Sequence, residues 1–143
     1  MKLKIILRIN LLSLLICSCF VSCGDNKADL LLKNEIQYND FFKQKDAYII
    51  YLYSSSCDAC VNVNPNVIHF LRKDKDKMYT LDVYNIQIDI KDESLDVYKN
   101  KVLGTSDINN LYFISLPSLY FISDGKVENV IININDINNF LLN

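Results

Sequence analysis

The stretch from Ala47 to Cys60 reads AYIIYLYSSSCDAC and joins an apolar run to a pair of cysteines. Such a continuous run of apolar, β-branched and aromatic residues is typical of a strand that is buried on both faces. Three serines end the run, and apolar residues then recur at helical spacing from Cys57 to about Lys75, interrupted by Pro65. We therefore predict a buried strand that leads directly into a helix carrying both cysteines in its first turn.

This placement of the cysteine pair suits thiol–disulfide chemistry. A helix N-terminus carries about half a positive charge, which favours a thiolate over a thiol, and the spacing of the pair places both sulfurs on one helical face. Cys57 at the helix start would attack a partner, and Cys60 one turn inside would resolve the mixed disulfide. Two alternatives are an inert structural disulfide and half of a zinc site, although no second Cys or His pair follows to complete the latter.

The remaining sequence alternates strand and helix patterns, which predicts a layered α/β domain. Helices are expected at Tyr38–Lys45, Glu93–Val102 and Ile134–Leu142, and strands at Tyr79–Ile90, Ser118–Ser123 and Lys126–Ile132, with a hairpin turn at Asp124-Gly125. The segment Asp29–Ile36 fits either a first strand or an early helix.

Several fixed spacings make this pattern resemble the thioredoxin family. Pro65 follows Cys60 by five positions, as does the proline that kinks the corresponding helix in that family. Leu116-Pro117 precedes an apolar strand, and Gly125 stands eight positions after Pro117, as around the family's cis-proline. The resemblance implies a thioredoxin-like fold, with a central mixed sheet of four to five strands flanked by helices. It also implies that Leu116 and a cis Pro117 bind the backbone of a substrate.

The sequence departs from that family at several positions. Ser56 stands before the first cysteine, where many thioredoxins have Trp, and Tyr51 occupies the position of their buried acid. Asp58 places a negative charge beside Cys57, which opposes a thiolate. The 56 residues between the second cysteine and Pro117 are more than in minimal thioredoxins. We therefore expect an insertion within 91–115 that shapes substrate choice.

The N-terminal segment has the layout of a secretory signal, because three basic residues precede an apolar stretch too short for a confident membrane span. It ends in Phe20-Val21-Ser22-Cys23, which resembles a bacterial lipobox; Cys19 is a weaker candidate for the processed cysteine. We predict a lipoprotein signal peptide over 1–22, lipidation of Cys23, a short tether over 23–28 and a thioredoxin-like domain over 29–143. An ordinary signal peptide or an uncleaved anchor is the alternative.

Composition excludes several functional classes. The 143 residues are 50% hydrophobic, which excludes a disordered chain, and a net charge of −2 gives no basic field for nucleic acid. His69, the only histidine, is expected on the same helix as the cysteines but several turns away, where it leaves no base near a nucleophile, so no Ser-His-Asp triad is expected. Removal of the signal would leave 12 basic against 17 acidic residues and a net charge of −5.

These features together predict an extracytoplasmic thiol–disulfide oxidoreductase, lipid-anchored to the cell membrane, or secreted if it is not lipidated. Its partners would be protein thiols and disulfides, together with a membrane or secreted redox partner that restores the dithiol. Neither a metal nor an organic cofactor is expected. The alternative is a non-catalytic binding or accessory module, for example in peptide export, in which Cys57 and Cys60 form a permanent structural disulfide.

Overall fold

The computed structural model describes residues 27–74, 77–86 and 88–143. The predicted signal peptide and the predicted lipid anchor Cys23 lie outside the described residues. Within the described ranges, no helix combines the length and the apolar character that crossing a membrane requires.

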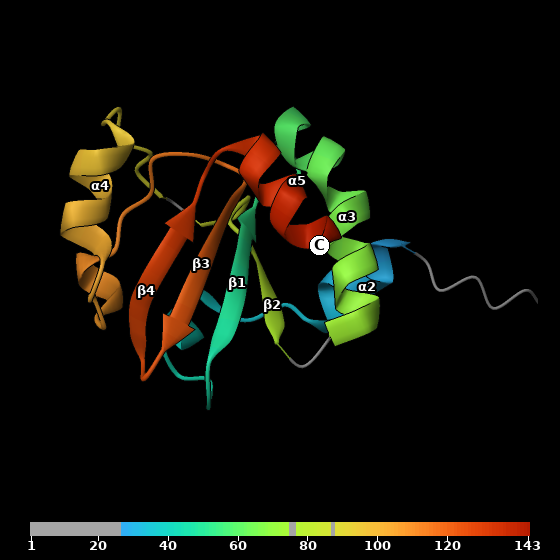
Figure 1. The fold of residues 1–143 in the computed structure, drawn as a ribbon, viewed down its shortest axis with the longest axis horizontal. Coiled ribbons are helices and arrows are strands. Elements are labelled where there is room, and N and C mark those ends of the chain that lie inside the picture. Colours follow the sequence, from blue (N-terminus) through green and yellow to red (C-terminus); the bar gives the residue numbers. More distant parts are fainter. Residues whose placement is uncertain (1–26, 75–76, 87) are drawn as a thin grey trace, which may run out of the picture.

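Four strands form a mixed sheet at the centre of the domain (Figure 1). They are β1 (Tyr48–Tyr53), β2 (Met78–Asp82), β3 (Ser118–Ser123) and β4 (Lys126–Ile131). β2 pairs with β1 in parallel, and β3 pairs antiparallel with both β1 and β4, so the order across the sheet is β2-β1-β3-β4. Because β1 and β2 are parallel, both end at the same edge of the sheet, which is the edge from which the chain enters the cysteine segment.

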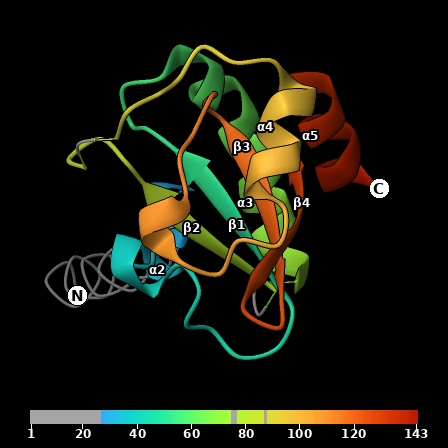
Figure 2. The same ribbon diagram turned by 90° about the vertical axis from the view of Figure 1, so that its left-hand side faces the viewer.

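Helices cover both faces of this sheet. They are α2 (Lys27–Lys33), α3 (Asp58–Asp74), α4 (Leu95–Val102) and α5 (Ile134–Leu142), with short 3-10 turns η2 (Tyr38–Asp40) and η3 (Ile108–Asn110). α3 and α5 pack against each other on one side, together with α2, whereas α4 lies on the other side and faces the viewer in Figure 2. The sheet is therefore the middle layer of three.

The buried strand β1 separates two apolar cores. All six of its residues are buried, as its apolar run predicts. Ile50 and Leu52 belong to the core beneath α4, whereas Ile49, Tyr51 and Tyr53 belong to the core beneath α3 and α5. Since its side chains pack on both faces of the sheet, β1 has a fixed position in the core, and the cysteine segment follows directly from its last residue.

The C-terminal part of the domain matches the sequence-based expectation closely. β3 and α5 have the predicted bounds, and β4 begins at the predicted residue. Asp124 and Gly125 have φ angles of 49° and 69°, the left-handed pair that a tight hairpin requires. The segment Asp29–Ile36, which fitted either structure, is helical as far as Lys33, and Glu35 then forms an isolated parallel bridge with Thr80 of β2.

Two predicted elements are wrong in extent. The helix expected over Tyr38–Lys45 is only the short turn η2, because the buried Phe41 points into the core and its carbonyl accepts a hydrogen bond from the Tyr48 hydroxyl at 2.7 Å. The strand expected over Tyr79–Ile90 ends at Asp82, whose side chain accepts the Tyr84 N–H and turns the chain.

Pro65, which interrupts the apolar spacing in the sequence, lies inside one helix. α3 continues through this residue over 17 residues, although proline cannot donate the helical hydrogen bond. The apolar stripe of Val63, Val67 and Leu71, all buried, continues on both sides of the proline. Packing of this stripe against the sheet and α5 explains why the helix does not break.

Candidate active site

The chain passes from β1 to α3 through a tight turn that fixes Cys57 at the start of the helix. The Cys57 N–H donates to the Ser54 carbonyl at 3.1 Å, and the Cys57 carbonyl accepts the first helical hydrogen bond, from the Val61 N–H at 3.1 Å. Cys57 is therefore the residue that caps α3, with its side chain at the positive end of the helix.

The two thiols differ in their access to solvent. Cys57 is half-buried, whereas Cys60 is 0% exposed, and both are free thiols. The Cys60 N–H donates to Sγ of Cys57 at 3.3 Å, and the Cys57 thiol donates to the Leu116 carbonyl at 3.8 Å. A partner molecule can therefore reach Cys57, while Cys60 can be reached only from Cys57.

The segment before β3 completes the site. The Leu116–Pro117 peptide bond is cis, as the resemblance to thioredoxins implied, and Pro117 is buried. Leu116 is half-buried, contacts both apolar cores and presents its carbonyl to Cys57. The four residues predicted from the sequence, which are Cys57, Cys60, Leu116 and Pro117, thus lie together at one edge of the sheet.

Beneath the thiols lies a neutral polar pair. Tyr51 is completely buried, and its hydroxyl donates to Oδ1 of Asn64 at 2.9 Å. Burial raises the pKa of Tyr51 far above its ordinary value, so the hydroxyl stays protonated. Burial also raises the pKa of the Cys60 thiol to about 12, and the hydrogen bond to the neighbouring Cys57 thiol adds to this increase. The deeper cysteine is therefore a protonated thiol at neutral pH.

The structure adds a carboxylate that sequence reasoning missed. Asp82, at the end of β2, stands beside Tyr53 in the parallel pair and accepts hydrogen bonds from the N–H groups of Ser55 at 3.3 Å and Tyr84 at 2.8 Å. Its charge contributes to the raised pKa of Cys60. The parallel order of β1 and β2 could have revealed it, because an acid at the end of one strand then adjoins the residues that follow the other.

The segment 91–115, expected as an insertion, forms α4, η3 and their connections. It supplies four buried residues to the core under α4: Tyr98, Val102, Leu111 and Phe113. The Tyr98 hydroxyl donates to the Tyr112 carbonyl at 2.9 Å, which ties α4 to the chain that leads toward Leu116. The segment is therefore a packed layer of the domain, and its effect on substrate choice stays a prediction.

His69, the only histidine, lies on the exposed side of α3. Within residues 27–74, 77–86 and 88–143, no three His, Cys, Asp or Glu side chains gather in a way that could hold a metal ion.

No family model matches this sequence. Among solved structures, mitochondrial thioredoxin 3 from Saccharomyces cerevisiae, in its oxidised form, is 18% identical, with 79% of this chain and 97% of that chain covered and a TM-score of 0.48. The germline-specific thioredoxin Deadhead from Drosophila melanogaster is 16% identical over 76% of this chain and 95% of its own, with a TM-score of 0.45. Thioredoxin O1 from Arabidopsis thaliana, also oxidised, is 14% identical over 85% and 92%, with a TM-score of 0.42.

The fold itself follows from the elements described above. A four-stranded mixed sheet lies between helices, a Cys-x-x-Cys pair opens the helix after the central strand β1, and a cis-proline precedes the antiparallel strand β3. This chain has a thioredoxin-like α/β fold.

Proposed function

We propose that the chain is an extracytoplasmic thiol–disulfide oxidoreductase, anchored to the membrane through lipid on Cys23, that acts on protein thiols and disulfides. One observation carries the proposal: the accessible Cys57 thiol meets the Leu116 carbonyl beside cis-Pro117, while Cys60 is buried behind it. An accessible sulfur, a buried sulfur and a backbone carbonyl beside a cis-proline lie at one edge of the sheet, which supports the roles of attacking thiol, resolving thiol and partner-binding segment.

The proposed reaction transfers two electrons in two exchange steps. Cys57, as a thiolate, attacks one sulfur of a substrate disulfide, forms a mixed disulfide and releases the other substrate sulfur as a thiolate. Cys60 then loses its proton and attacks Sγ of Cys57, which releases the second substrate thiolate and leaves a Cys57–Cys60 disulfide. A dithiol partner protein returns the electrons, and the reverse sequence oxidises a substrate dithiol.

Leu116 and Pro117 are proposed to orient the partner. Pro117 has no N–H, so the backbone ahead of β3 is not tied into the sheet at that residue. A substrate segment in extended conformation can therefore use the backbone of Leu116, which already lies within reach of Cys57. This places the substrate disulfide over the accessible sulfur rather than over Cys60.

The test is the thiol–disulfide equilibrium of a soluble form spanning residues 24–143, measured across glutathione and dithiothreitol series. We expect a reversible two-electron transition. Its midpoint potential should be about −270 mV if the protein acts as a reductant, or about −120 mV if it acts as an oxidant. The Cys57→Ser variant should keep the fold and lose all exchange. A disulfide that is reduced only at potentials well below about −300 mV, or a cysteine pair that never forms a disulfide, would contradict the proposal.

The membrane anchor is tested separately. We expect mass spectrometry of the N-terminal peptide to find lipid on Cys23, and the Cys23→Ser variant to move from the membrane fraction to the soluble fraction. The Cys19→Ser variant is the matched control and should remain on the membrane. Release of the protein by Cys19→Ser alone would assign processing to the earlier cysteine.

A second candidate function is a binding module with a structural disulfide. It is favoured by the neutral Tyr51–Asn64 pair, which leaves Cys60 without a carboxylate on β1 to accept its proton. For such a module, a paired Cys57→Ala/Cys60→Ala variant would keep binding its partner and lose only stability. For an exchange enzyme, the same variant loses turnover while the fold survives.

A further inference from the structure

A polar cavity of about 340 Å³ opens at the outer edge of β2, beside the cysteine segment. Its apolar wall comes from the sheet, from the chain that precedes β1 and from the chain that follows β2, and its polar rim carries two carboxylates and two amides. The residues that the argument uses are Ile36, Leu81 and Ile86 in the wall and Glu35, Gln37 and Asp82 at the rim. Among the described residues that line it, none is a lysine or an arginine.

The cavity adjoins the thiols through Asp82. One oxygen of this carboxylate accepts the N–H of Ser55, two residues before Cys57, so the rim of the cavity is joined directly to the turn that carries the attacking sulfur. Asp82 also stands beside Tyr53 in the parallel strand pair. Asp82 therefore links the rim of the cavity to the segment that carries Cys57, on the side of β1 that faces β2.

The negative charges of Asp82 and Glu35 both influence Tyr53, at the end of β1. Burial, followed by the negative charges of Asp82 and Glu35, raises the pKa of Tyr53 to about 12. Both charges thus converge on the end of β1, although they come from different segments of the chain. A cation placed in the cavity would be attracted by both.

We propose that this cavity binds a lysine or arginine side chain of the substrate, close in sequence to the cysteine that reacts with Cys57. The apolar wall fits the methylene stem of such a side chain, and the carboxylates fit its charged end. The inference rests on the proposed function, and it names the class of substrate: disulfides or thiols in basic segments. The excess of acidic residues in the chain agrees with a basic partner.

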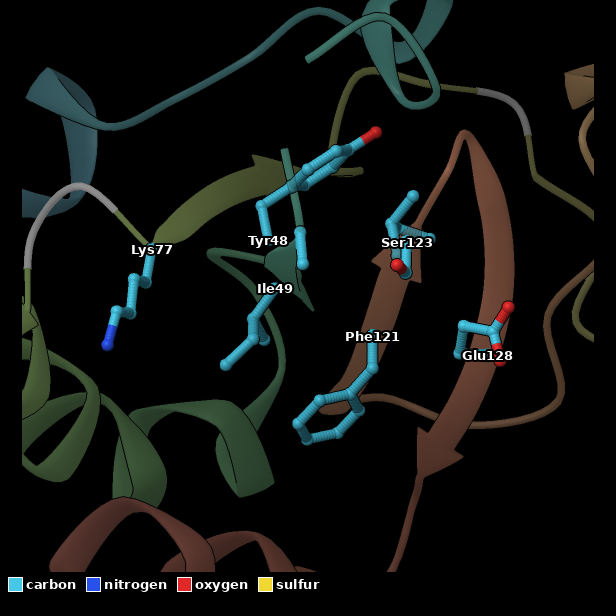
Figure 3. A pocket seen from close by; sticks show the side chains of 8 residues that line it. Tyr48, Ile49, Lys77, Phe121, Ser123 and Glu128 are labelled. Atoms are coloured by element: carbon cyan, nitrogen blue, oxygen red, sulfur yellow. The ribbon is translucent and has the colours of Figure 1, made fainter. Parts of the chain in front are cut away.

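A second cavity serves as a contrast. It has a volume of about 230 Å³ and lies at the start of β1, at the opposite end of the sheet from the cysteines. Lys77 and Glu128 stand on either side of its apolar floor, which contains Ile49 and Phe121 (Figure 3). Because it lies away from the thiols, removal of the Glu128 charge should not change the choice of substrate. Glu128→Gln is therefore a matched control for Glu35→Gln.

The test uses full-length protein in detergent and a set of synthetic peptides. Each peptide carries one cysteine in a mixed disulfide with a chromogenic thiol, and a single lysine is moved through the three positions on either side of it. A peptide with glutamine in place of the lysine is the reference. We expect at least one lysine position to lower KM by about fivefold with little change in kcat, the size that a partly exposed ion pair provides.

The variants then locate the effect. Glu35→Gln should remove the lysine preference, measured as the ratio of the KM values of the glutamine and lysine peptides, whereas Glu128→Gln should keep that ratio. Equal KM values for all peptides, with normal turnover, would overturn the cavity assignment and leave the oxidoreductase intact. A preference that survives Glu35→Gln would also overturn the assignment. Absence of turnover with every peptide would overturn the proposed function, and this inference with it.

Discussion

The Tyr51 hydroxyl donates a hydrogen bond of 2.9 Å to Oδ1 of Asn64, across the space between β1 and the helix that carries the cysteines. Because burial keeps this hydroxyl protonated, the pair is neutral. It stands where the resemblance to thioredoxins would place a buried acid. In the proposed exchange reaction, the proton of Cys60 would therefore have to go elsewhere, and Asp82 on the neighbouring strand is a carboxylate whose negative charge helps to raise the pKa of this thiol.

The first prediction concerns this hydrogen bond. Tyr51→Phe should lower the free energy of unfolding by about 1 kcal/mol, because Asn64 loses its donor while the ring and its stacking on Tyr53 remain. Urea denaturation measures the change. Tyr84→Phe, at a tyrosine that is 60% exposed, is the control and should change the stability very little. Equal effects of the two substitutions would mean that the buried hydrogen bond adds no stability.

The second prediction concerns the pH dependence of the reduced protein. Burial raises the pKa of the Cys60 thiol in the folded state to about 12, whereas an ordinary thiol has a pKa of 9.0. The unfolded state therefore binds fewer protons above that value, and the stability of the folded state must fall as the pH rises through this window. Urea denaturation of the reduced protein at pH 8 and pH 10 should show the loss.

The control for this effect is Cys60→Ala, which lacks the titrating thiol. Raised pKa values of buried tyrosines add a similar loss, but only above their ordinary value of 10.0. The difference between the unaltered protein and the variant below pH 10 therefore belongs to Cys60. An identical fall of stability in both proteins would show that this thiol is not held in its protonated form.

Sequence patterns predicted the elements in which local preference and packing agree. The run 47–53 is apolar at every position, the pattern of a strand buried on both faces, and Asp124-Gly125 provides the backbone conformation of a tight hairpin. The amphipathic pattern of Ile134–Leu142 places Ile137 and Leu141 against the core. In each of these segments, no distant contact has to override the local signal.

The errors arise where a side chain from elsewhere redirects the backbone. The Tyr48 hydroxyl donates a hydrogen bond to the carbonyl of Phe41, and the expected helix is shorter as a result. At the end of β2, the Asp82 side chain accepts the Tyr84 N–H and turns the chain. Such contacts between distant residues have no periodicity, so the pattern of apolar residues does not reveal them.

The candidate site was predicted in part. The resemblance to thioredoxins implied that Pro117 lies beside Cys57 and Cys60, and in the structure these residues lie together with Leu116. Asp82 and its cavity were not expected, because their position depends on which strand lies beside β1. The strand order is a property of the whole sheet, and no single sequence motif predicts it.

The third prediction tests the packing of α5. Leu141→Ala should lower the free energy of unfolding by about 2–4 kcal/mol, because this side chain is 3% exposed and packs in the core beneath α3 and α5. Its neighbour Leu142 is 57% exposed, so Leu142→Ala is a matched control that should cost about 0.5 kcal/mol or less. Similar losses for the two variants would mean that α5 is rotated relative to this structure.

The fourth prediction separates the roles of the two thiols. In Cys60→Ala, the accessible Cys57 can still attack a substrate disulfide, but no second thiol lies beneath it to release the product. The variant should therefore accumulate as a mixed disulfide with a disulfide-containing test protein such as insulin, seen as a larger species on non-reducing gels. Alanine is chosen because a serine hydroxyl at this fully buried position would need a hydrogen-bond partner. Cys57→Ala is the matched control and should form no such species, since the remaining thiol is buried and protonated. Mixed disulfides formed equally by both variants would contradict the assignment of Cys57 as the attacking sulfur.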